Sequence, residues 1–271
     1  MNQRKLSVKH PSTENKDKQI YFLCAMPRSG NTLFASIMNQ NPDLVVTPNS
    51  ITLEIMKQLF LLKRTDTFQN FPDEQSLNNV LDEVYTLYYK NWNYKTIIDR
   101  GPVCTPGNLM VMQKHFKQPI RCIVLVRDVL DVLASYIKWF ETEPTSFINS
   151  IKTLEEKLAK IMNKEGAVAK ELMSIQYLLH HPEMAVFIKY DDFVQNPERE
   201  LIKFYTFLNL PYFPHTFIDL DQITVNGLQY NDGIVGKNMH TIRTEKIMKV
   251  ENEYKKLIPE RFVKDYGHIT F

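Results

Sequence analysis

A short apolar segment that runs into a Pro/Gly turn and then into helical spacing constrains this chain more than any other feature. Residues 19–25, Gln-Ile-Tyr-Phe-Leu-Cys-Ala, are rich in aromatic and β-branched side chains, and residues 26–32 read Met-Pro-Arg-Ser-Gly-Asn-Thr. Apolar side chains within 33–38 then recur at helical spacing. The pattern predicts a buried strand that passes through a tight turn directly into a helix.

The turn has the chemistry of an anion site. A helix start leaves backbone N–H groups free and carries the positive end of the helix dipole. Arg28 adds a forked cation, and Ser29, Asn31 and Thr32 add side-chain donors. We therefore expect a phosphate or sulfate site, although an ordinary strand–turn–helix corner with an exposed arginine has the same pattern. The turn is not a Walker A loop, because Gly30 is its single glycine and no lysine follows it.

Strand-like segments alternate with segments of helical spacing along the chain. The strand-like segments are residues 20–24, 96–99, 121–126 and 185–189, and the helical ones include 77–88, 129–140 and 201–208. The uninterrupted apolar run at 122–126 is typical of a central parallel strand covered on both faces. The alternation predicts an α/β fold, with a P-loop-like central parallel sheet flanked by helices on both faces. Ligands of such sheets bind beyond the carboxyl ends of the strands.

Bulk properties indicate a single globular unit. The 271 residues contain no repeats or Gly/Ser linkers, so we expect one domain at 19–271 after a mobile polar tail at 1–18. A net charge of +2 is too small to indicate a nucleic-acid or membrane-surface partner. No apolar run has the length of a membrane helix, and residues 1–18 lack the apolar stretch of a signal peptide.

The three cysteines, Cys24, Cys104 and Cys122, show no metal-binding or redox spacing. Cys24 and Cys122 lie within apolar strand-like runs and are expected to be buried free thiols, which predicts a cytoplasmic protein in a reducing compartment, without a metal site. Two longer stretches complete the outline. Residues 149–181 are expected to be mainly helical, and residues 220–243, which are polar and without a clear period, are expected to form a functional loop.

A second candidate anion contact lies at the end of the apolar run 122–126. Arg127 follows this run, Asp128 is a plausible helix N-cap, and Ser135 comes eight residues after Arg127 on the expected helix. A strand-end arginine and a hydroxyl on the next helix can converge on one anion. An arginine at a strand end and a small residue packed in a helix explain the pattern equally well.

Together, these elements resemble the sulfotransferase family that uses 3′-phosphoadenosine 5′-phosphosulfate (PAPS). In that family a Pro-(Lys/Arg)-Ser-Gly-x-Thr loop after the first strand holds the 5′-phosphosulfate. A later strand-end arginine and a serine eight residues on hold the 3′-phosphate. The resemblance implies that the phosphosulfate is held by Arg28, Ser29, Gly30, Asn31 and Thr32, and the 3′-phosphate by Arg127 and Ser135.

Two further segments extend the resemblance over residues 20–244, closest to the bacterial and tyrosylprotein-like branches. Residues 186–194, followed by a Pro-headed helix, are similar to a pattern whose tyrosine contacts the nucleotide; that tyrosine would be Tyr190. A core-edge aromatic is the alternative. Residues 236–244 resemble the late loop that closes over the nucleotide, unless they form a solvated basic loop. Its candidate contacts are Lys237, His240 and Arg243.

The resemblance implies in-line transfer of the sulfuryl group from PAPS to a hydroxyl or amine of a small-molecule or peptide acceptor, leaving 3′-phosphoadenosine 5′-phosphate (PAP). Arg28 would stabilise the leaving phosphate, and Arg100 the transferring group. Asp99 is a candidate general base, although a structural ion pair with Arg100 is as plausible; Glu54 and His240 are the other candidates. A bridging metal ion is less necessary than in phosphoryl transfer, because a sulfuryl group carries less negative charge.

Two other functions stay open at this point. A P-loop-like nucleotide kinase would share the architecture, but it needs a lysine that this turn lacks. A non-catalytic binder of a phosphorylated ligand would keep the anion site and need no base. The identity of the acceptor is not encoded in a recognisable motif. Its pocket is expected to draw on residues 49–62, 92–94, 139–145 and 220–234.

Overall fold

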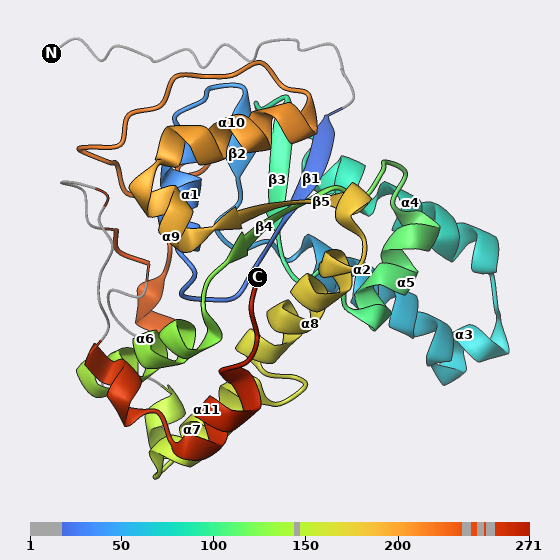
Figure 1. Cartoon of the computed structure of the whole chain (residues 1–271). Coiled ribbons are helices and arrows are strands. Elements are labelled where there is room, and N and C mark those ends of the chain that lie inside the picture. The colour runs from blue at the N-terminus through green and yellow to red at the C-terminus, as the bar shows by residue number, and fades with distance from the viewer. Residues whose placement is uncertain (1–17, 144–146, 235–239, 243–246, 248–252) are drawn as a thin grey trace, which may run out of the picture.

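A parallel sheet with the strand order β2-β3-β1-β4-β5 organises the computed structural model of the chain (Figure 1). The structure describes residues 18–143, 147–234, 240–242, 247 and 253–271. The strands are β1 Gln19–Ala25, β2 Leu44–Val46, β3 Thr96–Arg100, β4 Cys122–Val126 and β5 Ala185–Lys189. Every neighbouring pair is parallel, which confirms the predicted α/β class.

The predicted strands agree with the observed ones to within one residue at each end. The strand β2 was not predicted, because three residues carry too little periodicity. The helices are α1 Asn31–Met38, α2 Thr52–Leu61, α3 Asp66–Asn70, α4 Glu74–Tyr88, α5 Pro106–His115, α6 Val129–Thr142, α7 Leu154–Met162, α8 Ala167–Leu179, α9 Tyr190–Gln195, α10 Pro197–Leu208 and α11 Glu260–Tyr266. The predicted N-cap is confirmed, since Asp128 Oδ1 accepts a hydrogen bond from the Asp131 N–H at 2.9 Å.

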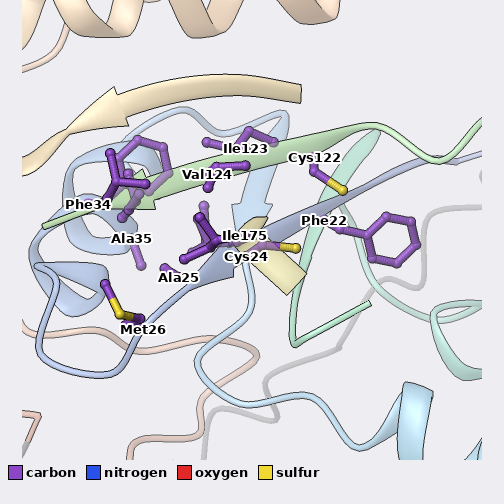
Figure 2. Packing of buried hydrophobic residues seen from close by; sticks show 14 of the residues in the cluster. Phe22, Cys24, Ala25, Met26, Phe34, Ala35, Cys122, Ile123, Val124 and Ile175 are labelled. Atoms are coloured by element: carbon purple, nitrogen blue, oxygen red, sulfur yellow. The ribbon is translucent and has the colours of Figure 1, made fainter. Parts of the chain in front are cut away.

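Helices cover both faces of the sheet (Figure 1). The helices α4 and α8 share one face, because alternate residues of β1 contact them: Phe22 packs edge-on against Tyr85 of α4, and Cys24 lies against Ser174 of α8. The helices α1, α9 and α10 pack together through Phe34, whose ring meets aromatic rings of both other helices. Figure 2 shows this core around β1 and β4, with Cys24 and Cys122 inside it. All three cysteines are buried and free, which confirms the prediction for Cys24 and Cys122.

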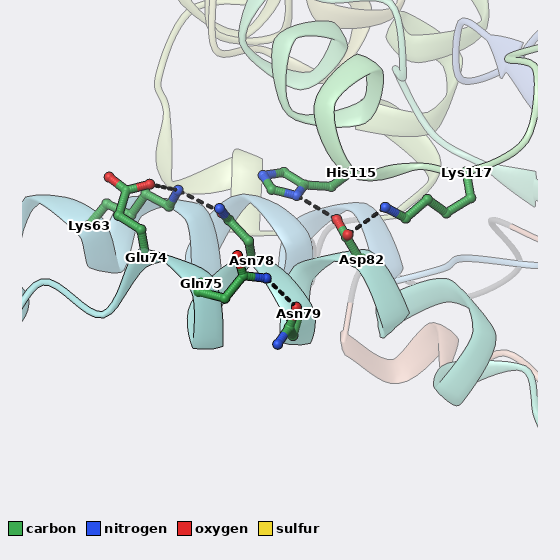
Figure 3. Close-up of polar contacts among 8 residues, drawn as sticks. All are labelled: Lys63, Glu74, Gln75, Asn78, Asn79, Asp82, His115 and Lys117. Carbon is green, nitrogen blue, oxygen red and sulfur yellow. Dashed lines mark hydrogen bonds and ion pairs between the residues drawn. The ribbon is translucent and has the colours of Figure 1, made fainter.

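Polar contacts fasten α4 to its neighbours at the edge of the molecule (Figure 3). The buried His115, at the end of α5, lies with Nδ1 2.8 Å from Asp82 Oδ1 of α4, and Lys117 binds the other oxygen of the same carboxylate. Lys63 Nζ donates to Glu74 at 3.0 Å and to Asn78 at 2.8 Å. These contacts hold α4 against the segments before and after it.

The strand order makes the carboxyl end of β1 the convergence point of the fold. From β1 the chain crosses to β2 at one edge and returns through β3; it then passes to β4 and β5 on the other side. The carboxyl end of β1 therefore lies between those of β3 and β4, at the topological switch point where ligands bind in open α/β sheets. The turn after β1 is thus brought next to Arg100 and Arg127.

Across the described part of the chain, every helix is too short or too polar to span a bilayer.

Phe34→Ala should lower the free energy of unfolding by about 3–5 kcal/mol, because the fully buried ring joins α1 to α9 and α10. Urea unfolding followed by circular dichroism measures the loss. Phe71→Ala, at a residue that is 77% exposed, is the matched control. A loss below about 1 kcal/mol for Phe34→Ala would contradict the described packing.

Candidate active site

The turn after β1 folds into a compact loop that presents the start of α1. The Ser29 N–H donates to the Met26 carbonyl at 3.2 Å, and the Phe34 N–H donates to the Gly30 carbonyl at 2.9 Å. Gly30 has φ +89° and Arg28 has φ +70°, so the loop uses the left-handed region twice. The first N–H groups of α1 have no partner within the helix and face out of the turn.

A contact between Gly30 and Tyr190 closes the loop against β5. A Cβ atom added to Gly30 would lie 2.8 and 2.9 Å from two ring carbons of Tyr190, so the ring occupies the space of a side chain. The guanidinium of Arg127 lies 4.3 Å from the centroid of the same ring, and its Nη1 donates to the Arg28 carbonyl at 2.8 Å. The ends of β1, β4 and β5 are thereby joined around Arg127.

Arg28 reaches α6 from the loop. Its Nε donates to Ser135 Oγ at 3.0 Å, and the expected contact of Ser135 with a 3′-phosphate beside Arg127 stays a prediction. Burial lowers the pKa of Arg28, and the nearby positive charge of Arg127 lowers it further; Tyr136 and Asp232 act in the opposite direction. Two cations held this close favour a bound anion.

Three buried polar atoms of this site have no hydrogen-bond partner among the described residues: Ser29 Oγ, Asn31 Oδ1 and Arg127 Nε. The amide nitrogen of Asn31 donates to the Met26 carbonyl at 3.2 Å, so this side chain braces the loop from inside. Thr32 is half-buried in the first turn of α1. Unpaired buried polar groups are rare in folded proteins. Two of these atoms, Ser29 Oγ and Arg127 Nε, can donate to an anion beside the helix N-terminus, whereas Asn31 Oδ1 is an acceptor. The residues therefore fit the phosphate groups of a nucleotide.

Arg100 and the segment after α10 form the opposite wall. Arg100 Nη1 donates to the Pro48 carbonyl at 3.0 Å and to the Tyr230 hydroxyl at 3.4 Å. The Tyr230 ring stacks on His240 at 3.7 Å, and both the N–H and Nδ1 of His240 bond to the carboxylate of Asp232. Burial lowers the pKa of His240, as do Arg100 and Arg28, although Asp232 raises it. Lys237 and Arg243, the other contacts expected in this loop, lie outside the described residues.

The other base candidates differ sharply in exposure. Asp99 is 2% exposed, and burial raises its pKa to about 6 in spite of hydroxyl groups around it, including Thr47 Oγ1 at 3.4 Å. The predicted ion pair of Asp99 and Arg100 is not among the described contacts. Glu54 is exposed on α2 and accepts a hydrogen bond from Gln58.

Two cavities open on either side of Arg100 and Tyr230 and share Asn49 and Ser50. The larger, of 490 Å³, is lined by Arg100 and by residues of α2 and α8. The smaller, of 280 Å³, has aromatic walls from Tyr88, Tyr89, Trp92 and Tyr230. Residues from the expected segments 49–62, 92–94 and 220–234 line these cavities, and their contact with an acceptor stays a prediction. Trp139 is instead buried against Tyr136 and Phe140 in α6.

Glu171 of α8 was not singled out from the sequence, where it is one charged residue in a helical segment. It lines the 490 Å³ cavity, is 8% exposed, and its Oε2 has no hydrogen-bond partner in the described part of the chain. Burial raises the pKa of Glu171 well above its ordinary value; Cys24 raises it further, and Arg100 lowers it. Tyr230 and Asp232 were also missed, because they lie in an aperiodic stretch.

A parallel α/β sheet with an anion loop after its central strand, and arginines after β3 and β4, defines a nucleotide-binding protein of P-loop-like architecture. Residues 18–232 match the sulfotransferase domain family, so the chain belongs to that family. It is therefore an enzyme that transfers a sulfuryl group. The donor that this family generally uses is PAPS, and the transfer requires an acceptor substrate.

Solved structures share the fold. The sulfotransferase domain from the curacin biosynthetic pathway is 18% identical and superposes with a TM-score of 0.50, covering 95% of this chain and 93% of that one. The sulfotransferase domain from the Synechococcus PCC 7002 olefin synthase is 14% identical, with a TM-score of 0.51 and coverage of 96% and 98%. No curated protein sequence matches the chain.

Gly30→Ala should destabilise the fold by about 1–2 kcal/mol and weaken PAP binding, because the new Cβ meets the Tyr190 ring at a left-handed φ. Urea unfolding and calorimetry with PAP measure the two effects. Gly107→Ala is the control, since a Cβ there meets nothing within 4 Å. Equal behaviour of the two variants would argue against the described loop.

The free energy of unfolding of Glu171→Gln should increase relative to that of the parent chain as the pH rises from about 5 to 8. The raised pKa means that native Glu171 holds its proton more tightly than the unfolded chain does. The parent therefore loses stability as the pH rises from the unfolded pKa toward the folded one, and glutamine removes this loss. Urea unfolding at several pH values, with Glu183→Gln as the exposed control, measures the difference; a difference independent of pH would contradict the burial of the charge.

Proposed function

We propose that this sulfotransferase takes the sulfuryl group from PAPS and passes it by in-line displacement to a hydroxyl or amine of a small molecule or peptide, releasing PAP. The observation that carries the proposal is the cluster of Arg28, Arg127 and unpaired buried donors at the N-terminus of α1. The three free, buried thiols are consistent with a reducing cytoplasmic setting.

The loop and α1 bind the 5′-phosphosulfate. The N–H groups at the start of α1 and the side chains of Ser29 and Thr32 donate to its oxygens, and Gly30 lets the backbone approach closely. Arg28 is half-buried beside them and stabilises the charge that develops on the leaving phosphate oxygen. Asn31 contributes its backbone N–H, because its side-chain amide already donates to the Met26 carbonyl within the loop.

Arg127 and Tyr190 hold the adenosine end. Together they line a 350 Å³ cavity with Lys189 and residues 269–271. Arg127 keeps its Nε for a ligand and donates from Nη1 to the loop carbonyl, so it can hold a 3′-phosphate and the loop at once. Ser135 Oγ accepts a hydrogen bond from Arg28 Nε and so orients the Arg28 guanidinium.

Arg100 stabilises the transferring sulfuryl group from the other wall, where it is anchored by the Pro48 carbonyl and the Tyr230 hydroxyl. We expect His240, in the segment after α10, to contact the nucleotide as well; Lys237 and Arg243, the other contacts expected there, lie outside the described residues. No metal ion is assigned a role, since the arginines supply the charge stabilisation.

The function is tested by binding and by turnover. Thermal shift and calorimetry should detect binding of PAP to the protein but no binding of ATP with magnesium. A metabolite extract incubated with the protein and PAPS labelled with a heavy sulfur isotope should yield labelled sulfate esters or sulfamates in mass spectrometry. Binding of ATP with magnesium in place of PAP would favour a kinase, and PAP binding without any labelled product would favour a non-catalytic binder.

Arg28→Ala should reduce sulfuryl transfer by on the order of 10²–10³, because one charge-stabilising contact to the leaving group is lost. Transfer is measured as PAP released from PAPS, with melting temperature as the check on folding. Arg121→Ala, at the opposite end of β4, where Arg121 binds the Phe207 carbonyl, is the control for loss of an arginine. A rate for Arg28→Ala within a few-fold of the parent would refute the role.

Arg127→Ala should weaken PAP binding by roughly 10- to 150-fold, the equivalent of about 1.5–3 kcal/mol for a charge-assisted contact. Binding of adenosine 5′-phosphosulfate, which lacks the 3′-phosphate, should change much less. Calorimetry with both ligands makes the comparison, and equal losses for the two would mean that Arg127 does not contact the 3′-phosphate.

A further inference from the structure

We propose that the acceptor enters the 490 Å³ cavity beside Arg100 and that Glu171 is the general base that takes the proton of its hydroxyl or amine. The proposal rests on the proposed function, because it concerns the same transfer step.

The helix α8 places Glu171 by contacts one turn further along. Ser174 Oγ accepts a hydrogen bond from the Cys104 N–H at 3.1 Å and lies 3.7 Å from Cys24 Sγ of β1. These contacts fix α8 against the ends of β1 and β3, next to the loop that binds the phosphosulfate. Glu171, on the preceding turn, therefore faces the site from beneath, near the backbone N–H of Ala25.

The carboxyl is buried and incompletely paired. Glu171 is 8% exposed, and its Oε2 has no hydrogen-bond partner in the described part of the chain. Buried polar groups are normally satisfied, so an unpaired carboxyl oxygen in the wall of a cavity indicates a place for a ligand's donor. The hydroxyl or amine of an acceptor is such a donor, and Arg100 lines the same cavity.

The groups around Glu171 act on its pKa in opposite directions. Burial and Cys24 raise its pKa, while Arg100 and the Ala25 N–H lower it. Enzymes raise carboxyl pKa values toward the working pH by such burial. The other titratable groups of the cavity and of the segments packed against Glu171 are Glu54 and Lys57 of α2, Cys104 after β3, and Lys164, Glu165 and Lys170 at the start of α8.

The other candidates are less well placed. Asp99 is buried behind Thr47 and does not line any of the described cavities. Glu54 is exposed at the rim. His240 has Nδ1 bonded to Asp232 and does not line the described cavities beside Arg100 either.

The step balances without a further reactant. The acceptor oxygen or nitrogen forms a bond to sulfur as the bond between sulfur and the phosphate oxygen breaks. The acceptor proton moves to the Glu171 carboxylate and then to solvent, and PAP leaves with the electron pair of the broken bond.

Glu171→Gln should lower PAP formation from PAPS by roughly 10²–10⁴, because the amide keeps the size of the side chain but cannot accept the proton. The full chain is assayed with 4-nitrophenol, 2-phenylethanol and 2-phenylethylamine, and without added acceptor, when water takes the sulfuryl group. The rise of the parent rate with pH should disappear in the variant, while the affinity for PAP stays within threefold. Glu183→Gln, an exposed residue just after α8, is the control and should keep the parent rate.

A Glu171→Gln rate within threefold of the parent would overturn the proposal, as would a loss of PAP affinity equal to the loss of rate. A loss seen in Asp99→Asn or His240→Ala but not in Glu171→Gln would place the base elsewhere. If the parent chain fails to bind PAP, the proposed function itself fails. PAP binding together with normal turnover in Glu171→Gln would reject Glu171 as the base and leave the proposed function intact. The two failures are therefore distinguishable.

A labelling experiment covers the case in which none of these acceptors is turned over. A small diazo ester alkylates protonated carboxyl groups that it can reach, with loss of N₂. Peptide mass spectrometry after labelling at pH 5, where a carboxyl of raised pKa holds its proton, should find Glu171 esterified more than Glu54 and Glu165 of the same cavity. Modification of Glu54 and Glu165 without Glu171 would overturn the proposal, because Glu171 would then be closed to the cavity.

Discussion

The guanidinium of Arg127 is the contact on which the site depends. It follows β4, donates to the carbonyl of Arg28 in the loop after β1, and lies against the ring of Tyr190 after β5. Three strand ends that are far apart in sequence are therefore held in one geometry by one planar cation. The two half-buried arginines, Arg28 and Arg127, repel each other, and a negatively charged ligand that binds between them relieves this repulsion.

The site divides its charges between two walls. The wall formed by α1, β4 and α6 carries Arg28 and Arg127 and suits the charged ends of a nucleotide. The wall formed by β3 and α8 carries Arg100 and the carboxyl of Glu171, which offsets the positive charge of Arg100 when it is ionised. Only one of the two walls thus attracts anions strongly, which separates the place of the donor from the place of an uncharged acceptor.

Local sequence patterns were sufficient to predict the elements that are most deeply buried in the fold. The strand at 19–25, its turn and the arginine after 122–126 could be predicted because burial and turn chemistry leave clear periodic signals. Strand β2 is too short to leave one. Glu171, Tyr230 and Asp232 could not be identified, because their importance depends on contacts across the sheet and not on their neighbours in sequence. The pairing of Ser135 with Arg28 is likewise set by where α6 packs, which spacing alone does not encode.

The Tyr190 ring beside Gly30 limits how related sequences can diverge at this position. The ring of Tyr190 occupies the position of a Cβ atom, and the backbone at Gly30 is left-handed. A smaller residue at position 190 removes the first obstacle to a side chain at position 30 but leaves the second. A change at position 190 is therefore compatible with glycine at position 30, whereas position 30 gains no freedom from changes at 190. Among homologues that keep this loop, glycine should stay at position 30 whatever residue stands at position 190.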